Sequence, residues 1–298
     1  MNLLITGAWK DATDYISHIE ELGHTVVFMP DESAPLPVEP DWVEGVVCNG
    51  LFLRQDIRRF VNLQYVQLTS AGLDRVDVPY IREQGITLHT ARDVYSIPIA
   101  EFCVASVLHM YKKMKDFSKQ QADRIWKKIP DLVELYDKQV CIIGCGHIGR
   151  ACARRFAAFG CRVVGVDCDI TPRADFSVLY SVEDMDAVLS ESDVVVLCVP
   201  LTEDTREMMD SRRIGLLKPT CVVVNVARGG VLDIGALTER LQMDELFAVL
   251  DVHDVEPLPQ DSPLWEMERV FLTPHNSYAG QGNTARLYQE IITNLKEH

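Results

Sequence analysis

The stretch VCIIGCGHIGR at residues 140–150 decides the fold of this chain. Four apolar residues lead directly into three glycines with G-x-G-x-x-G spacing, Gly144, Gly146 and Gly149. A helical pattern of small and aromatic residues follows, and a second apolar run then ends at Asp167. An isolated glycine-rich turn is a weak signal. A strand, a tight turn, a helix, a second strand and an acid in this order are instead typical of a dinucleotide-binding βαβ unit.

Each part of this motif has a physical role in holding a dinucleotide. The glycines permit the turn, the approach of backbone to a pyrophosphate and the packing of helix on strand, and the helix N-terminus faces the phosphate charge. Asp167 can accept hydrogen bonds from ribose hydroxyls, and with Asp169 it would repel a 2′-phosphate, which favours NAD over NADP. Arg173 could nevertheless allow the chain to bind some NADP. We expect NAD to bind at Gly144, Gly146, His147, Ile148, Gly149 and Asp167.

The composition is that of a globular protein with room for two domains. Of the 298 residues 47% are apolar and 24% are charged, and the formal net charge is −15. Such a chain has no excess of cations to replace the counterions of a polyanion, which argues against nucleic acid and anionic membranes as partners. Nine cysteines without a C-x-x-C pair favour a reduced, cytoplasmic protein without a metal site. No apolar run suits a membrane span or a signal peptide.

Short apolar runs alternate with helical patterns along almost the whole chain. In the first 90 residues we expect strands at 3–6, 25–29, 43–48, 65–68 and 86–89, with helices at 11–22, at 55–60 and ending at 84. A long helix begins near Ser96, and strands follow at 140–143, 161–166, 193–199, 220–226, 246–252 and 270–273, before a final helix at 280–298. This alternation predicts an α/β fold with parallel sheets and right-handed crossovers.

Polar side chains follow three strands of the second half, where ligands of a parallel sheet bind. Arg228 stands two residues after the strand at 220–226. An arginine at this position can bind a carboxylate through two hydrogen bonds. The alternative is a structural arginine that caps the C-terminus of a helix. Several acids, including Glu256, follow the next strand, and His275 follows the last one. Because histidine donates and accepts protons near neutral pH, we expect Arg228, Glu256 and His275 to form a catalytic group.

With these motifs the chain resembles the D-isomer-specific 2-hydroxyacid dehydrogenases over nearly all its length. The matching segments are TSAGLD at 69–74, IGCGHIG at 143–149, VPLT at 199–202, NVARGG at 225–230, Asp251 with Glu256-Pro257, and TPH at 273–275. The resemblance implies two doubly wound parallel-sheet domains, Rossmann-like or flavodoxin-like, with a cleft between them. Residues 1–95 and 277–298 would form the substrate-binding domain, and residues 96–276 the NAD-binding domain.

The resemblance also implies a role for each site residue. Arg228 would bind the carboxylate of a 2-oxo acid, His275 would transfer the proton, and Glu256 would orient His275 and favour its charged form. Further substrate contacts are expected from Asn49, Gly50, Ala71 and Gly72, and further coenzyme contacts from Val199, Pro200, Thr205, Ala227 and Asp251. The implied activity is NAD-dependent interconversion of small 2-oxo acids and (R)-2-hydroxy acids by a homodimer.

Alternatives stay open at this stage. An NAD(H)-sensing corepressor or scaffold of the same fold would keep the same motifs, and a glyoxylate or hydroxypyruvate reductase could use NADPH. A formate dehydrogenase is disfavoured, because those relatives pair the histidine with glutamine and position 256 is glutamate.

Two features of the sequence bear on the substrate. The chain departs from the family in the segment Asn276-Ser277-Tyr278 that follows His275, so the nicotinamide side of the site can differ. The run LFL at residues 51–53 is expected either to line the cleft, which suits pyruvate or larger 2-oxo acids, or to belong to the core. Because Arg54 follows this run, hydroxypyruvate and glyoxylate also stay candidate substrates.

Overall fold

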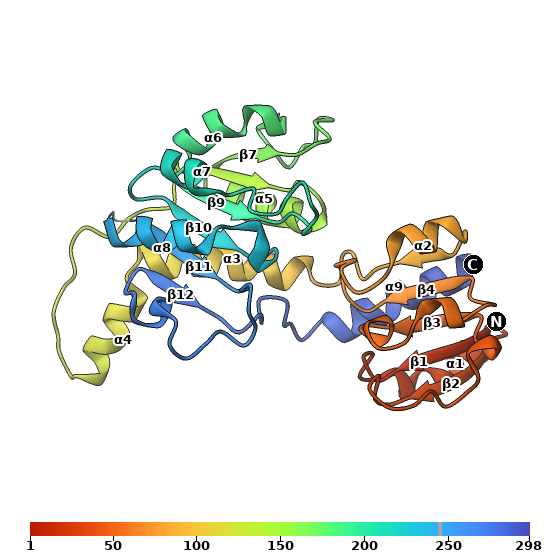
Figure 1. The fold of residues 1–298 in the computed structure, drawn as a ribbon. Coiled ribbons are helices and arrows are strands. Elements are labelled where there is room, and N and C mark those ends of the chain that lie inside the picture. Colours follow the sequence, from red (N-terminus) through yellow and green to blue (C-terminus); the bar gives the residue numbers. More distant parts are fainter. Residues whose placement is uncertain (244–245) are drawn as a thin grey trace. The chain divides into compact units, whose positions relative to one another are not determined.

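Two parallel β-sheets, one in each of two structural units, organise the chain (Figure 1). The computed structural model describes residues 1–243 and 246–298. One unit contains residues 1–95 and 280–298, and the other contains residues 96–279. The chain therefore returns to the first unit at residue 280, three residues later than the expected boundary at residue 277. The two sheets confirm the predicted α/β class with two parallel-sheet domains.

The sheet of the first unit has five parallel strands in the order β2-β1-β3-β4-β5, which is the flavodoxin-like order. Its strands are β1 (Asn2–Thr6), β2 (Thr25–Met29), β3 (Gly45–Cys48), β4 (Tyr65–Leu68) and β5 (Thr87–His89). Its helices are α1 (Ile16–Glu21), α2 (Val78–Glu83) and α9 (Asn283–Glu297).

Alternate residues of these strands face opposite layers of the first unit. Leu3 and Ile5 pack in one core with side chains of α1 and α9, whereas Leu4 packs in a second core with Ile81 of α2. The helical stripe of α9 is buried in the first of these cores, as its spacing predicts, through Leu287, Ile291 and Leu295. The last helix of the chain therefore completes the fold of its first 95 residues.

The sheet of the second unit has seven parallel strands in the order β12-β11-β10-β9-β6-β7-β8. Its strands are β6 (Gln139–Ile143), β7 (Arg162–Val166), β8 (Val178–Tyr180), β9 (Val194–Leu197), β10 (Val222–Asn225), β11 (Phe247–Leu250) and β12 (Val270–Leu272). Its helices are α3 (Ser96–Tyr111), α4 (Met114–Ala122), α5 (His147–Ala158), α6 (Met185–Glu191), α7 (Ser211–Leu216) and α8 (Ile234–Met243). The winding direction reverses between β6 and β9, which is where a doubly wound sheet binds a dinucleotide.

The structure differs from the predicted elements at four places. Strand β8 was not predicted, because an edge strand of only three residues is too short to show a periodic pattern. The helix expected at 11–22 is a 3₁₀ turn followed by the short α1, and the one at 55–60 is a single 3₁₀ turn. The long helix from Ser96 ends at Tyr111. Lys113 then has a φ of 49°, and α4 starts after it, because a left-handed residue cannot continue a right-handed helix.

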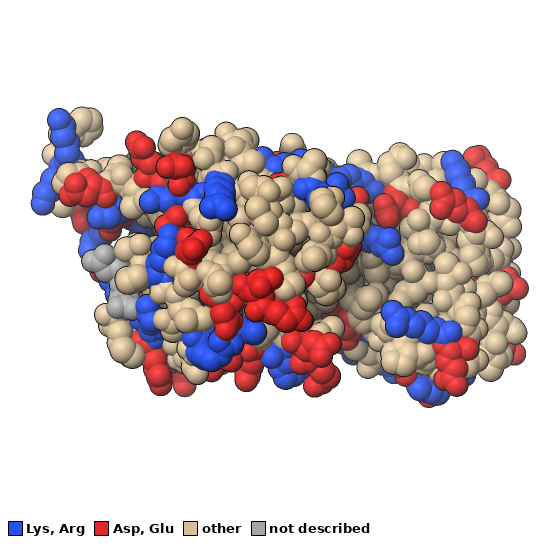
Figure 2. All heavy atoms as spheres, turned by 90° about the horizontal axis from the view of Figure 1, so that it is seen from above, with Lys and Arg blue, Asp and Glu red and all other residues tan. Residues whose placement is uncertain are grey.

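On the face drawn in Figure 2, acidic and basic side chains are interspersed. All nine cysteines are free thiols, and most of them are buried. Within residues 1–243 and 246–298, none of the helices has the length and apolar character needed to cross a membrane.

Candidate functional site

The glycine loop between β6 and α5 has the tight backbone that its spacing predicts. Gly144 has a φ of 92°, which side chains rarely tolerate. A Cβ added at Gly149 would lie 2.1 Å from the carbonyl oxygen of Gly144, so only glycine lets the helix begin this close to the strand. By contrast, no described atom lies within 4 Å of a Cβ added at Gly146. The loop is therefore packed at its first and third glycines and open at the second.

The open side of the loop meets the N-terminus of α5. Gly146 and His147 are exposed, and among the described residues no side chain caps this 12-residue helix. The first amides of the helix and its dipole place positive partial charge there. This open, uncapped helix end fits the pyrophosphate of a dinucleotide.

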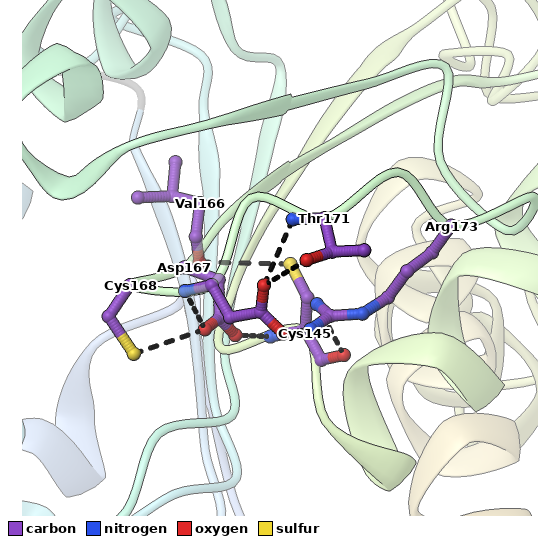
Figure 3. Close-up of polar contacts among 7 residues, drawn as sticks. Cys145, Val166, Asp167, Cys168, Thr171 and Arg173 are labelled. Carbon is purple, nitrogen blue, oxygen red and sulfur yellow. Dashed lines mark hydrogen bonds and ion pairs between the residues drawn. The ribbon is translucent and has the colours of Figure 1, made fainter.

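Asp167 lies at the end of β7, directly beside the glycine loop (Figure 3). Its Oδ2 accepts a hydrogen bond from the Cys145 amide at 2.6 Å, and its Oδ1 accepts one from the Asp169 amide at 3.0 Å. The Cys168 thiol also approaches Oδ1, at 3.4 Å. Because a carboxylate has about four acceptor positions, these bonds orient Asp167 and leave room for a ribose hydroxyl.

The other predicted coenzyme residues lie on loops at the same edge of the sheet. The Cγ1 atom of Val199 would lie 2.9 Å from a Cβ added at Gly144, so Val199 packs against the glycine loop. The Thr205 hydroxyl donates to the carbonyl of Pro200 at 2.6 Å and braces the loop after β9. Ala227 is buried directly after β10. Contact of these four residues with a coenzyme stays a prediction.

Arg228 follows β10 in an extended, half-buried conformation. Asn225 holds this loop in place: its side-chain amide donates to the Arg228 carbonyl at 3.1 Å, and its Oδ1 accepts from the Ala227 amide at 3.0 Å. The guanidinium of Arg228 donates to the Ala227 carbonyl through Nη1 at 2.8 Å. The arginine is thus positioned by a rigid turn at the carboxyl end of a central strand.

The loop of Arg228 packs directly on the turn after β11. A Cβ added at Gly229 would lie 2.2 Å from the carbonyl carbon of His253, so a side chain there would collide with that turn. The same turn carries Glu256, whose Oε1 accepts a hydrogen bond from the His253 amide at 3.0 Å. The backbone therefore brings the segments of Arg228 and Glu256 together.

Glu256 pairs with His275, which follows β12. The distance between Glu256 Oε2 and His275 Nδ1 is 2.9 Å, and both side chains stay about one third exposed, at 38% and 34%. Burial raises the pKa of Glu256, but the hydrogen bonds from His275 and from the His253 amide outweigh it and hold the pKa below its ordinary value. The pairing occupies Nδ1 and leaves Nε2 as the imidazole nitrogen for proton transfer.

Asp251 anchors the segment that carries His275. It is only 1% exposed, and its carboxylate accepts hydrogen bonds from the Thr273 hydroxyl at 2.6 Å and from the amides of Asn276 and Ser277 at 2.8 and 3.0 Å. Its carbonyl oxygen accepts the His275 amide at 2.8 Å. These bonds hold His275 at a φ of 51°, an uncommon conformation for a residue with a side chain. Contact of Asp251 with the nicotinamide stays a prediction.

His275 is followed by the segment Asn276-Ser277-Tyr278, where the sequence was expected to depart from the family. The Tyr278 ring meets the imidazole edge-on, with ring centroids 6.1 Å apart and an interplanar angle of 84°. Ser277 is buried and bound to Asp251. The departure therefore places an aromatic side chain directly beside His275.

The predicted substrate residues of the first unit follow its adjacent strands β3 and β4. Ala71 is exposed and Gly72 half-buried after β4. After β3, the amides of Asn49 and Gly50 both donate to the carboxylate of Glu32 at 2.7 Å. Those two amides are therefore engaged within the protein.

The run at residues 51–53 divides between the two roles that were considered for it. Leu51 is fully buried in the core, and Phe52 packs against that core with its ring edge-on to Phe60. Leu53 is 64% exposed. Leu51 therefore belongs to the core, whereas Leu53 and the exposed part of Phe52 are available to line a binding site.

Sequence reasoning did not assign a role to three residues that brace the site segments, Asn225, Thr273 and Glu32. Asn225 and Thr273 stand at strand ends inside the quoted motifs, so their position was the available signal. Glu32 lies in a proline-rich loop, where no pattern indicates its hydrogen bonds to Thr6, Asn49 and Gly50.

Several known proteins are similar to this chain over most of its length. A family model described as "D-isomer specific 2-hydroxyacid dehydrogenase, NAD binding domain" matches residues 104–277. The hydroxypyruvate reductase of Thermotoga maritima is 32% identical over 272 residues, which cover 89% of this chain and 87% of that protein. The D-3-phosphoglycerate dehydrogenase of Methanocaldococcus jannaschii is 33% identical over 234 residues, 77% of this chain but 44% of that protein. The structure of D-lactate dehydrogenase from Aquifex aeolicus, complexed with NAD and lactic acid, has a TM-score of 0.81 at 25% identity and covers 99% of this chain and 94% of its own.

Proposed function

This chain belongs to the D-isomer-specific 2-hydroxyacid dehydrogenases, which carry an NAD-binding domain, and we propose that it interconverts small 2-oxo acids and (R)-2-hydroxy acids. The observation that carries the proposal is the 2.9 Å pair of Glu256 and His275, in which Glu256 lies on a turn that packs against the backbone of the Arg228 loop. A carboxylate-bound imidazole can donate a proton, and a guanidinium on the neighbouring loop can bind a carboxylate.

Arg228 binds the substrate carboxylate in this proposal. A guanidinium offers a planar pair of N–H donors that matches the two oxygens of a carboxylate. The bonds of Asn225 to the Arg228 and Ala227 backbone keep the arginine in place, and its guanidinium also donates to the Ala227 carbonyl through Nη1. The oxo group next to the bound carboxylate is then held at a defined position.

His275 acts as the general acid during reduction and as the general base during oxidation. In reduction, its Nε2 proton passes to the carbonyl oxygen while the carbonyl carbon gains a hydride, and the product is a hydroxyl group. Bound NADH supplies that hydride. In oxidation, neutral Nε2 accepts the hydroxyl proton. Glu256 keeps Nδ1 bonded and stabilises the positive charge of the protonated ring, and general acid catalysis of this kind contributes ~10²–10⁴ in rate.

Small, polar 2-oxo acids are the proposed substrates, with hydroxypyruvate first. The hydroxypyruvate reductase that matches 89% of this chain supports this choice. Leu51 is buried in the core and Phe52 packs against it, which reduces the apolar lining that would favour large substrates. We propose that amides of Ala71 and Gly72 donate to the substrate carboxylate. Asn49 and Gly50 contribute through the shape of their loop, because their amides bind Glu32.

Initial rates across a panel of 2-oxo acids test the proposal. Glyoxylate, hydroxypyruvate, pyruvate, 2-oxoisocaproate and phenylpyruvate are each assayed with NADH and with NADPH, and chiral chromatography identifies the product. We expect NADH-dependent turnover that yields the (R) enantiomer from substrates with a chiral product. Binding of NADH without turnover of any panel member would reject the enzymatic proposal in favour of a nucleotide-sensing protein.

We further propose that the enzyme is a cytoplasmic homodimer. Nine free thiols suit a reducing compartment. The α4 arm, residues 114–129, stands away from the sheet of its own unit (Figure 1). It exposes Trp126 fully and Ile125 by half. Exposed apolar side chains of this size mark interaction surfaces. Arg124, Lys127 and Lys128 flank them in a chain of net charge −15, which favours a second acidic copy as the partner.

A further inference from the structure

The loop after β7 holds a second acid and an arginine close to the coenzyme carboxylate. It runs from Asp167 to Arg173 with the sequence DCDITPR and folds back against Cys145 of the glycine loop (Figure 3). Asp167 occupies the position whose carboxylate accepts the 2′-hydroxyl of the adenosine ribose, and in NADP-binding relatives of this fold class a nearby arginine holds the 2′-phosphate. Arg173 is thus an arginine near the 2′ position of a chain with an NAD-type acid.

Arg173 is held by two contacts that orient its guanidinium. Nη2 lies 2.6 Å from Asp169 Oδ2, and Nη1 donates to the Cys145 carbonyl at 3.3 Å. The arginine side chain is 21% exposed, whereas that of Asp169 is 58% exposed. Asp169 therefore engages one terminal nitrogen of the guanidinium and is the more exposed partner of the ion pair.

Asp169 is itself fixed by its own loop. Its Oδ1 accepts hydrogen bonds from the Thr171 amide at 3.0 Å and from the Thr171 hydroxyl at 2.6 Å, which leaves Oδ2 directed to Arg173. These bonds hold the pKa of Asp169 below its ordinary value, so the carboxylate stays charged at neutral pH. A carboxylate held in this way competes with any phosphate for the same arginine donors.

We propose that Asp169 is a second determinant of coenzyme choice, which acts by engaging Arg173 and thereby blocking a latent 2′-phosphate site. Asp167 and Asp169 together outweigh the single positive charge of Arg173, and a 2′-phosphate would bring a further charge of about −1.5 to −2. Asp167 acts on the ribose directly, whereas Asp169 is a positioning residue that acts through the arginine. The proposal rests on NAD binding at Asp167 and does not depend on which 2-oxo acid is the substrate.

Four variants test the proposal through coenzyme affinity. Fluorescence titration measures the Kd of NADH and of NADPH for the parent, Asp169→Asn, Arg173→Gln and the double variant Asp169→Asn/Arg173→Gln, without any substrate. Asp186→Asn is the matched control, because it removes the same charge and releases Arg212 and Arg213 elsewhere in the unit. The ratio of kcat/KM with NADPH to that with NADH is a second readout on the preferred substrate.

We expect Asp169→Asn to tighten NADPH binding by about tenfold or more, with little change for NADH, since the released guanidinium gains a phosphate partner. The double variant should lose this gain, and Asp186→Asn should behave like the parent. An equal gain in the single and double variants would overturn the proposal, because it would reflect the removed charge alone. Unchanged NADPH affinity in Asp169→Asn would overturn it as well. If the proteins bind NADH but do not turn over any substrate, that result would contradict the proposed enzymatic function and not the proposal on coenzyme choice.

Discussion

Glu256 is the residue that most directly determines the state of the proposed acid. It accepts the His253 amide through one oxygen and His275 through the other, so its carboxylate cannot rotate freely. The histidine is in turn fixed by its backbone bond to Asp251. With both partners oriented, one nitrogen of the ring is bonded and proton transfer is confined to Nε2.

The first residue-scale prediction concerns the proton donor. We expect His275→Gln to lower kcat for reduction by ~10²–10⁴, because glutamine cannot donate a proton to the carbonyl oxygen. The Kd of NADH should be unchanged, because the glycine loop and Asp167 hold the coenzyme in a different part of the unit. Steady-state kinetics and NADH fluorescence titration measure the two effects. Near-normal turnover in this variant would reject the role of His275.

The second residue-scale prediction concerns acid stability. The folded-state pKa of Glu256 lies below the unfolded value of about 4.3. Its charge therefore stabilises the fold above that pH, and this contribution is lost as the pH falls through the folded-state pKa. We expect Glu256→Gln to be less stable than the parent at neutral pH, by a difference that shrinks toward about pH 3.5. Urea unfolding at both pH values measures it, and a difference that is independent of pH would contradict the pairing.

At the scale of elements, the site depends on how strand ends and helix starts meet. The segment from β6 to α5 can turn only because Gly144 adopts a positive φ and Gly149 has no side chain. The loops after β7 and β9 then close on this turn through Asp167 and Val199. We therefore expect coenzyme binding to depend on three loops held in register by parallel strands.

The element-scale prediction compares two glycine substitutions. Gly149→Ala should destabilise the protein by about 1–3 kcal/mol and weaken NADH binding, because its Cβ would collide with the Gly144 carbonyl and displace the loop. Gly215→Ala in α7 is the control. No described atom lies within 4 Å of the added Cβ, and alanine should stabilise the helix by about 0.5–1 kcal/mol. Thermal unfolding and NADH titration follow both variants. Equal behaviour of the two would show that the close contact at Gly149 has no consequence.

At the scale of the whole molecule, the chain leaves its first unit at residue 95 and returns to it at residue 280. The first unit is complete only when α9 buries Leu287, Ile291 and Leu295 in its core. The second unit is continuous and carries all three proposed catalytic residues. The α4 arm belongs to this second unit and exposes apolar side chains that its own unit does not cover.

The whole-molecule prediction is that Trp126→Asp dissociates the proposed homodimer. Trp126 is fully exposed in one chain, and a charge in a buried apolar interface is costly. Light scattering after size exclusion should give twice the mass of one chain for the parent and the mass of one chain for the variant. Val61→Asp, at an apolar side chain of the first unit that is 72% exposed, is the control and should leave the dimer intact. A monomeric parent protein would reject the dimer itself.

Much of the site could be predicted because glycine spacing and strand ends are local signals. The dinucleotide motif, Asp167 and the parallel alternation of strands and helices follow from short patterns that constrain the backbone directly. The bracing contacts could not be predicted, because each joins segments that are distant along the chain. Glu32 reaches the amide of Asn49, and Asp251 reaches that of Ser277. Edge strand β8 was missed because three partly exposed residues carry no periodic pattern.

By itself, the sequence determined the α/β class, the coenzyme motif and the identity of the residues with acid, base and guanidinium chemistry, because these depend on residue type and short-range spacing. Only the tertiary structure decided which of these groups are engaged. It joined Glu256 to His275, engaged the Asn49 and Gly50 amides with Glu32, and paired Arg173 with Asp169. Hydrogen bonds of this kind depend on where separate loops come together, and that is set by the packing of strands and helices rather than by any local pattern.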